Sequence, residues 1–300
     1  MLIAALEAGG ENMICSIGNP ERGVMQRASI ATGSPETTMP RIIDFFSKFD
    51  VKALGVGSFG PLDLDPASEH YGSITGTPKA EWKNYPLLKT LVSALGVPGE
   101  IDTAVNAAAL AEHRMGAGRG ARSMLYLSVG ADVGGGWIVN GRPLYGMTHP
   151  EAGHMLITPE KDDPMPEGVC PFHKHCAEGA ASAPSMERRW GLPPRLMTED
   201  HPAWALEAKY IAQICANAVV MMSPERIVIG GSVMRPHLYP LIRRHTLELL
   251  GGYIVHEYLT EAGAESYIVP PQLGMNAGVT GALLLGVQAL QMQERESYHI

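Results

Sequence analysis

The order of its predicted elements makes this chain an α/β protein with two domains. Apolar strands alternate with helices along 300 residues, which is enough chain for two cores. Each half begins with the same pattern of a strand, a glycine-containing turn and a second strand. The turn is Gly9-Gly10 in the first half and 130–136 in the second half. We therefore predict one domain at 1–120 and another at 121–276, related by a weak internal duplication.

The first domain is expected to open with a β-meander. Three short apolar runs lie at 2–6, 13–17 and 24–30, separated by turn residues. A helix follows Pro35, because apolar residues then recur at helical spacing. The remaining elements are a buried strand at 51–56, a helix at 87–95, a short strand at 99–103 and an alanine-rich helix at 105–116.

The second domain repeats this alternation with longer helices. Its first two strands lie at 124–129 and 137–140, and Asn140-Gly141 is a hairpin signal. The remaining elements are helices at 185–190 and 203–222, a strand at 226–229, a helix at 236–250, a strand at 267–269 and a last helix at 277–290. We expect the polar residues after Gln291 to fray.

The composition is that of an ordinary globular protein, with 45 % hydrophobic and 18 % charged residues. The formal net charge of −8 repels phosphate backbones, so no nucleic acid partner is expected. No apolar run has membrane-spanning length and no cleavable leader is recognisable, so we expect no membrane partner and a cytoplasmic location. Cys15 and Cys215 lie in apolar segments, and a disulfide framework is not expected.

The stretch 149–178 has the residue types of a zinc site. The four candidate ligands are His154, Cys170, His173 and Cys176. Thiolates and imidazoles in this number suit tetrahedral Zn²⁺. The last three are spaced three residues apart, and the prolines and glycines near them disfavour regular structure, so we predict a structural zinc that holds the loop. His175 is an alternative to His173, since the spacing excludes neither.

Together these motifs resemble the ROK sugar kinases, most closely their bacterial fructokinase branch. The matching segments keep their order along the chain and are Glu7-Ala-Gly-Gly, Gly55-Val-Gly-Ser-Phe-Gly-Pro-Leu-Asp, Thr77-Pro-Lys, Val105-Asn-Ala-Ala-Ala-Leu, Gly134-Gly-Gly, His149-Pro-Glu-Ala-Gly-His, Cys170-Pro-Phe-His-Lys-His-Cys and Ile229-Gly-Gly. The resemblance implies an actin-like, ribonuclease-H-like ATPase fold, with sugar deep in a cleft between the domains and ATP above it. It also implies that the last helix packs back on the first domain and that the protein is a homodimer. We expect no winged-helix domain before the first strand.

The resemblance further implies which residues contact the ligands. The expected sugar contacts are Asn106, Glu151, His154 and Glu178, of which His154 also reaches the metal. The expected nucleotide contacts are Gly9, Gly10, Gly130, Gly134, Gly135, Gly230 and Gly231. Carboxylates and amides are directional partners for vicinal hydroxyls, and a metal fixes the tautomer of its histidine. A simple helix N-terminal role is the alternative for Asn106.

The position of the family's catalytic base does not match. The family reads Asp-Thr-Asp-Val-Asn, whereas this chain reads Asp102-Thr103-Ala104-Val105-Asn106. Ala104 cannot accept a proton, and a positioned base is typically worth about 10²–10⁴ in rate. Asp102 is expected to be a poor substitute, because alternation along a strand would turn its side chain to the opposite face.

Both phosphate-binding motifs carry new acids. Gly9-Gly10-Glu11-Asn12 stands where the family has Gly-Gly-Thr-Lys, and Asp132 stands where it has glycine. Turns of this kind bind phosphate through backbone N–H groups, which nearby carboxylates would oppose. Each like-charge contact at about 4 Å costs on the order of 4 kcal/mol at an effective dielectric near 20, before any Mg²⁺ cancels it.

These departures predict a protein that keeps a polar, sugar-like pocket but has lost phosphoryl transfer from ATP, and that acts on a small polar substrate by other acid–base chemistry. Glu11, Asp132 and Glu151 are then the candidate catalytic residues. A non-catalytic pseudokinase that binds a sugar or a partner is the first alternative. The second alternative is a fructokinase or hexokinase that uses ATP and Mg²⁺ with a relocated base.

Overall fold

The computed structural model describes residues 1–19 and 21–297, which divide into two compact units. Within the described residues, unit 1 comprises 1–19, 21–111, 143–150 and 275–297, and unit 2 comprises Glu112–Arg142 and Glu151–Gly274. The chain leaves unit 1 within helix α3 (Ala104–Met115) and returns to it twice. Unit 1 is therefore assembled from three separate segments.

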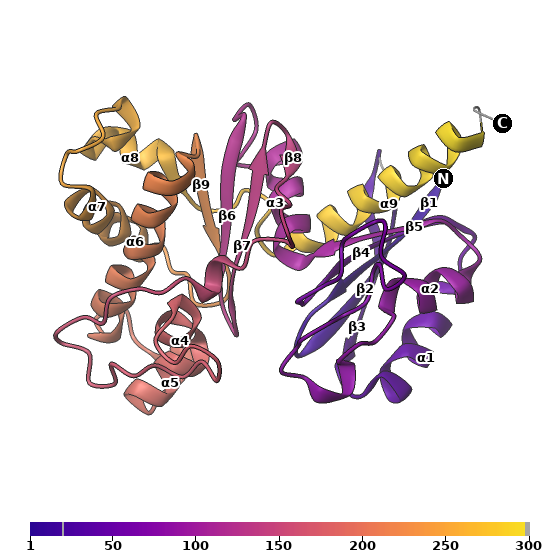
Figure 1. Cartoon of the computed structure of the whole chain (residues 1–300), viewed down its shortest axis with the longest axis horizontal. Coiled ribbons are helices and arrows are strands. Elements are labelled where there is room, and N and C mark those ends of the chain that lie inside the picture. The colour runs from indigo at the N-terminus through magenta and orange to yellow at the C-terminus, as the bar shows by residue number, and fades with distance from the viewer. Residues whose placement is uncertain (20, 298–300) are drawn as a thin grey trace. The chain divides into compact units, whose positions relative to one another are not determined.

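Unit 1 is built on a five-stranded sheet with the order β3-β2-β1-β4-β5 (Figure 1). The strands are β1 (Leu2–Ala8), β2 (Asn12–Asn19), β3 (Gly23–Ala31), β4 (Val51–Ser58) and β5 (Gly99–Thr103). The pairs β1–β2 and β2–β3 are antiparallel, as the predicted meander requires. The pairs β1–β4 and β4–β5 are parallel, so each needs a crossover connection.

Alternate residues of β1 meet different helices on the two faces of this sheet. Leu6 belongs to a core that includes residues of α1 (Pro35–Phe46) and α2 (Leu87–Leu95). Ile3 and Ala5 belong to a second core with Val279 of α9 (Ala277–Ser297). The last helix of the chain thus covers one face of the sheet that the first strands form.

Unit 2 contains a second five-stranded sheet, with the order β10-β9-β6-β7-β8 (Figure 1). The strands are β6 (Ser123–Val129), β7 (Val133–Val139), β8 (Arg142–Pro143), β9 (Arg226–Gly230) and β10 (Ile268–Val269). The pair β6–β7 is antiparallel, and the pairs β6–β9 and β9–β10 are parallel. The β7-β6-β9 part repeats the strand directions of β2-β1-β4, which supports the predicted duplication.

The helices of unit 2 follow its strands as expected, with some unpredicted short ones. Its α-helices are α4 (Ala177–Ala181), α5 (Ala183–Trp190), α6 (Ala203–Met222), α7 (Leu238–Leu250) and α8 (Glu261–Tyr267). Single 3₁₀ turns in this unit are η2 (Ala152–His154), η3 (Pro194–Leu196) and η4 (Glu257–Leu259). Another, η1 (Ala80–Trp82), lies in unit 1, and η5 (Gly274–Asn276) crosses the boundary in the chain between the units. Within residues 1–19 and 21–297, no helix is long and apolar enough to cross a membrane.

The end of the chain differs from the prediction. Helix α9 continues to Ser297, so the expectation that the polar residues after Gln291 fray is wrong up to that residue. The polar side chains there do not prevent the helix from continuing. Residues 298–300, to which the same expectation applied, lie outside the described residues.

Candidate active site

A buried carboxylate and an amide meet where β5 runs into α3 in unit 1. The Asp102 side chain accepts two hydrogen bonds at Oδ1, from Thr103 N at 2.7 Å and from Asn106 Nδ2 at 2.8 Å. Its Oδ2 accepts a third from the Tyr145 hydroxyl at 2.5 Å. Asp102 and Asn106 are each 1 % exposed. Tyr145 comes from the segment Pro143–Pro150, which belongs to this unit.

The expectation that Asp102 is a poor substitute rested on its side chain pointing to the opposite face of a strand from position 104. That strand argument does not apply here, because Ala104 is the first residue of α3. From that point the backbone is helical, and Asp102 bonds directly to Asn106, four residues later. The sequence contains no local signal for Tyr145, which is 43 residues from Asp102.

The surroundings of Asp102 change its acidity. The pKa of Asp102 is raised to about 6, and burial is the main cause. Hydrogen bonds from Tyr145, Asn106 and Thr103 lower the pKa, and the charge of Glu100 raises it. Glu100 itself accepts a hydrogen bond from the Tyr71 hydroxyl. The carboxyl of Asp102 therefore changes its protonation state much closer to neutral pH than an ordinary aspartate.

The first glycine turn, also in unit 1, has a cation beside it. Gly9 N donates to Asn12 O at 3.0 Å, which closes the turn. A Cβ placed on Gly10 would stand 3.4 Å from Lys79 Cε and 4.0 Å from its Nζ. Glu11 is exposed to solvent. Water therefore screens the charge of Glu11, and Lys79 opposes it, so the repulsion expected from the sequence is too large.

In unit 2 the structure brings two glycine motifs together. A Cβ on Gly130 would stand 3.2 Å from the Oγ atom of Ser232. Ser232 is the residue that follows Gly230-Gly231 in the sequence. Gly231 has a φ of +103° and its α-carbon faces the backbone of Val129, where a side chain has no room. Gly134 and Gly135 instead lie within strand β7, and Gly135 packs against Ala152 of η2.

Three carboxylates gather beside these turns in unit 2. They are Asp132, Glu151 and Glu178, and Glu178 Oε2 accepts a hydrogen bond from Val133 N at 3.4 Å. Desolvation, and then the charges of Glu178 and Asp132, raises the pKa of Glu151 to about 7. Because Glu151 also keeps contact with solvent, screening reduces the part of this shift that is due to charge. Of the three predicted catalytic residues, Asp132 and Glu151 belong to this group, whereas Glu11 belongs to unit 1.

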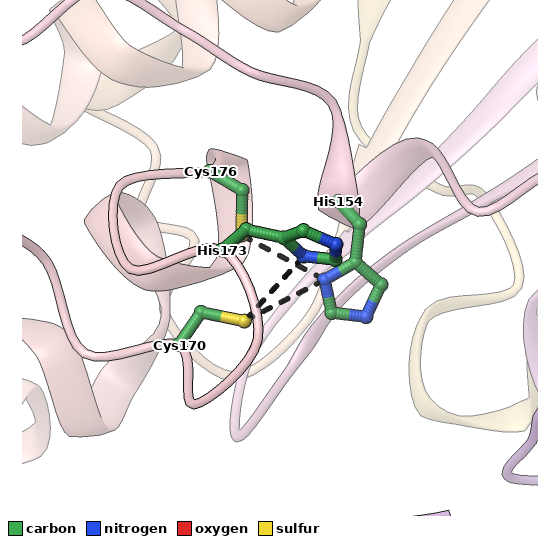
Figure 2. A group of neighbouring side chains, drawn as sticks. All are labelled: His154, Cys170, His173 and Cys176. Atoms are coloured by element: carbon green, nitrogen blue, oxygen red, sulfur yellow. Dashed lines mark hydrogen bonds between the residues drawn. The ribbon is translucent and has the colours of Figure 1, made fainter. Parts of the chain in front are cut away.

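The predicted metal ligands form one compact group in unit 2 (Figure 2). One donor atom from each of His154, Cys170, His173 and Cys176 lies within 4.8 Å of the other three. Cys170 Sγ is 3.8 Å from Nδ1 of both histidines, and Cys176 Sγ is 3.7 Å from His154 Nδ1. Tetrahedral zinc with ordinary Zn–S and Zn–N bonds would separate sulfur from nitrogen by about 3.6 Å. The donor set therefore fits a metal ion of this kind.

Local backbone geometry holds the group in place. Cys176 caps helix α4, with its Sγ accepting from Gly179 N at 3.4 Å. Cys170 and Lys174 form an isolated β-bridge, and Lys174 has a φ of +56°, which closes the turn between the ligands. His175 lies outside the group, with its ring 5.4 Å from that of Tyr210.

The geometry of each unit defines a class of protein. Two mixed sheets with matching strand directions, each covered by helices, form the actin-like ATPase fold that was predicted. The structure matches a ROK hexokinase of Thermus thermophilus with a TM-score of 0.75, at 24 % identity, over 98 % of this chain and 100 % of that one. It matches a ROK glucokinase of Streptomyces griseus, solved with glucose and AMPPNP, with a TM-score of 0.77, at 21 % identity, over 96 % and 100 %.

The sequence identifies the family within that class. Residues 3–289 match the ROK family, and the chain belongs to it. A Bacillus subtilis (strain 168) protein is 40 % identical over 97 % of each chain. The fructokinase of Lactococcus lactis subsp. cremoris is 37 % identical over 92 % of this chain and 93 % of its own. The fructokinase of Pediococcus pentosaceus is 37 % identical over 97 % and 99 %.

These relatives contradict the main functional prediction of a protein without phosphoryl transfer. Relatives named fructokinase align over nearly the whole chain, which favours the fructokinase alternative instead. The repulsion by Glu11, on which this prediction partly rested, was taken at a dielectric near 20, whereas Glu11 is exposed and water screens its charge more strongly.

Proposed function

We propose that the protein transfers the terminal phosphate of ATP to a hydroxyl of fructose or a closely related hexose. The similarity to fructokinases over 92 and 97 % of the chain carries this proposal. The four residues expected to hold sugar hydroxyls support it, because each is present and has directional hydrogen-bonding groups; they are Asn106, Glu151, His154 and Glu178.

Asn106 and Glu178 would recognise the sugar from defined orientations. The bond from Asn106 Nδ2 to Asp102 fixes which way its amide faces. The bond from Val133 N to Glu178 fixes one oxygen of that carboxylate. Groups held in this way lose little conformational freedom on binding, which favours the positioning of one hydroxyl for transfer.

The nucleotide would bind as its magnesium complex at the glycine turns. The turn at Gly130, with Gly231 and the Ser232 hydroxyl beside it, offers backbone groups and a hydroxyl to a ligand. Lys79 would add a positive charge beside the Gly9-Gly10 turn. When bound, Mg²⁺ would neutralise the phosphates and reduce their repulsion by Asp132.

We propose zinc as the metal of the Cys/His group, held by His154, Cys170, His173 and Cys176. Four protein ligands complete a tetrahedral shell, so the ion would be structural rather than catalytic. Because η2 carries His154 and Cys176 caps α4, the ion would fix the backbone near Glu151 and Glu178. In this way the metal supports the sugar-binding residues without touching the reaction.

We also propose an oligomeric state and a cellular location for the protein. Exposed apolar side chains of unit 2 line one shallow depression, and a second copy would cover them; they are Leu156, Val220, Leu249 and Tyr253. We therefore propose a homodimer. None of the four cysteines, all of which the structure describes, is in a disulfide, which supports the reducing cytoplasm as the location.

A coupled assay of ADP formation tests the function. The protein with MgATP should form ADP at a rate that depends on added fructose, within the ordinary kinase range of about 1–100 s⁻¹. Glucose and mannose at equal concentration establish the preference among hexoses, and product analysis identifies the phosphorylated hydroxyl. ADP formation that is the same with and without any of these sugars would refute the proposal.

A further inference from the structure

The proposed kinase reaction needs a proton acceptor that the residue at position 104 cannot provide. Ala104 begins helix α3 and carries no ionisable group. In unit 1, the carboxylate that bonds to the neighbouring Asn106 is Asp102. The inference that follows rests on the proposed function, and it concerns how this chain completes the reaction.

The two oxygens of Asp102 have different surroundings. Oδ1 is held by the Thr103 amide and by Asn106 Nδ2, so it fixes the orientation of the carboxylate. Oδ2 receives the Tyr145 hydroxyl at 2.5 Å, within the range of strong bonds from a hydroxyl to a carboxylate. Asp102 is 1 % exposed and Tyr145 is 49 % exposed. Tyr145 is therefore the member of this pair that reaches solvent.

We propose that Asp102 Oδ2 is the proton acceptor of phosphoryl transfer and that the Tyr145 hydroxyl relays the proton to it. The relay replaces the carboxylate that is missing at position 104. Tyr145 is the residue that would touch the reacting hydroxyl of the sugar, and Asp102 acts through it.

The step balances in atoms and charge. The sugar oxygen forms a bond to the terminal phosphorus of ATP, and the bond from that phosphorus to the bridging oxygen of ADP breaks. The proton of the sugar hydroxyl passes to Tyr145 Oη as the original Tyr145 proton passes to Asp102 Oδ2. After product release the same path returns the proton to solvent, and Asp102 is ionised again.

The electrostatics favour a concerted transfer. Burial, and then the charge of Asp102, raises the pKa of Tyr145, so a free tyrosinate is disfavoured and both protons must move together. Burial raises the pKa of Asp102 to about 6, which makes it a stronger base than an ordinary aspartate while leaving it ionised at neutral pH. The other ionisable groups that interact with this pair are Glu100 and Tyr71.

Four variants of the full chain test the relay. Asp102→Asn keeps the shape and most hydrogen bonds of the side chain but removes the base, so kcat should fall by about 10²–10⁴ with the sugar KM nearly unchanged. Tyr145→Phe should lower kcat in the same way by at least about tenfold. Tyr85→Phe is the matched control, because it removes a tyrosine hydroxyl of unit 1 whose ring packs on Trp82, and kcat should be unchanged. Ala104→Asp added to Asp102→Asn should restore much of the lost kcat, which loss of folding would not allow.

The pH profile gives a further readout. At saturating sugar, kcat of the wild-type protein should fall as the pH drops below about 6, and this limb should be absent from Asp102→Asn. If the wild-type protein is active and the kcat of Asp102→Asn lies within threefold of the wild-type kcat, the relay is wrong and the proposed function is unaffected. A fully active Tyr145→Phe protein overturns it as well, whether or not Asp102→Asn folds. A wild-type protein without sugar-dependent ADP formation overturns the function and the relay together.

Discussion

The backbone of Gly55 in β4 lies directly against the backbone of Gly286 in α9. A Cβ on Gly55 would stand 2.4 Å from Gly286 N and 1.8 Å from Ala282 O, and a Cβ on Gly286 would stand 3.0 Å from Gly55 N. Two residues without side chains thus let the last helix approach the sheet of unit 1 at backbone distance. This close approach brings Val279 and Leu283 onto Ile3 and Ala5.

The first prediction follows from this contact. Gly55→Ala should lower the free energy of unfolding by about 1–3 kcal/mol or more, because the atoms in its way are backbone and cannot turn aside. Gly76→Ala is the control, since a Cβ there meets nothing within 4 Å and should change stability by less than about 0.5 kcal/mol. Urea unfolding of both variants measures the difference. Equal stabilities would mean that α9 does not lie this close to β4.

The second prediction concerns the metal. The wild-type protein should bind about one zinc per chain, and His173→Ala should lose most of it, because it removes one of four ligands. His175→Ala should keep its zinc, since His175 lies two residues away but outside the group. Elemental analysis of the purified proteins after dialysis measures this. Zinc lost from His175→Ala and kept by His173→Ala would reverse the assignment.

The third prediction concerns the nucleotide. Lys79→Ala should raise the KM for ATP by about ten- to a hundredfold, because a contact between an ammonium and a phosphate is worth about 1.5–3 kcal/mol. The sugar KM should change little. Lys52→Ala is the matched control, since Lys52 pairs with Asp50 at the surface. An unchanged KM for ATP in Lys79→Ala would show that Lys79 does not meet the phosphates.

The fourth prediction is a pH dependence of stability. The pKa of Asp102 rises from 3.8 to about 6 on folding, so the folded state binds more protons between these values. The free energy of unfolding should therefore fall as pH rises from about 4 to about 6, by up to about 3 kcal/mol, and then stay level. The free energy of unfolding of Asp102→Asn should not fall over this range, so the variant should become more stable relative to wild type between pH 4 and pH 7. The same difference at both pH values would contradict the raised pKa.

The fifth prediction concerns the assembly. Light scattering should show a dimer, and Tyr253→Asp should shift it toward monomer, because it places a charge on a side chain that is 89 % exposed among apolar neighbours. Glu261→Lys, an exposed charged position in the same unit, should leave the dimer intact. A dimer that is insensitive to Tyr253→Asp would place the interface elsewhere.

Sequence reasoning succeeded where the evidence was local. The apolar runs of β1, β2 and β4 and the periodicity of α1 depend on neighbours within one element, so the fold could be predicted. The metal group could also be predicted, because three of its ligands share one tight turn. In each case the relevant spacing is readable in the chain itself.

It failed where the evidence depended on tertiary contacts or on a change of backbone state. The orientation of Asp102 could not be derived from strand alternation, because the chain turns helical at Ala104. Tyr145 and Lys79 were missed because their contacts join segments 43 and 69 residues apart, and no local pattern marks such pairs. The sequence also does not show that Glu11 is exposed, and this exposure determines how strongly water screens its charge.

The route of the chain through unit 1 has a consequence for biosynthesis. Unit 2 is complete once Gly274 has been made, but unit 1 still lacks α9 at that moment. On the ribosome, the face of β1 and β4 that carries Ile3, Ala5 and Ala53 therefore waits uncovered while more than two hundred residues are added. At about 5–20 residues per second this exposure lasts on the order of ten seconds or more. Chaperones that bind nascent chains have that interval in which to act, and the N-terminal strands become the last part of the protein to reach their native packing.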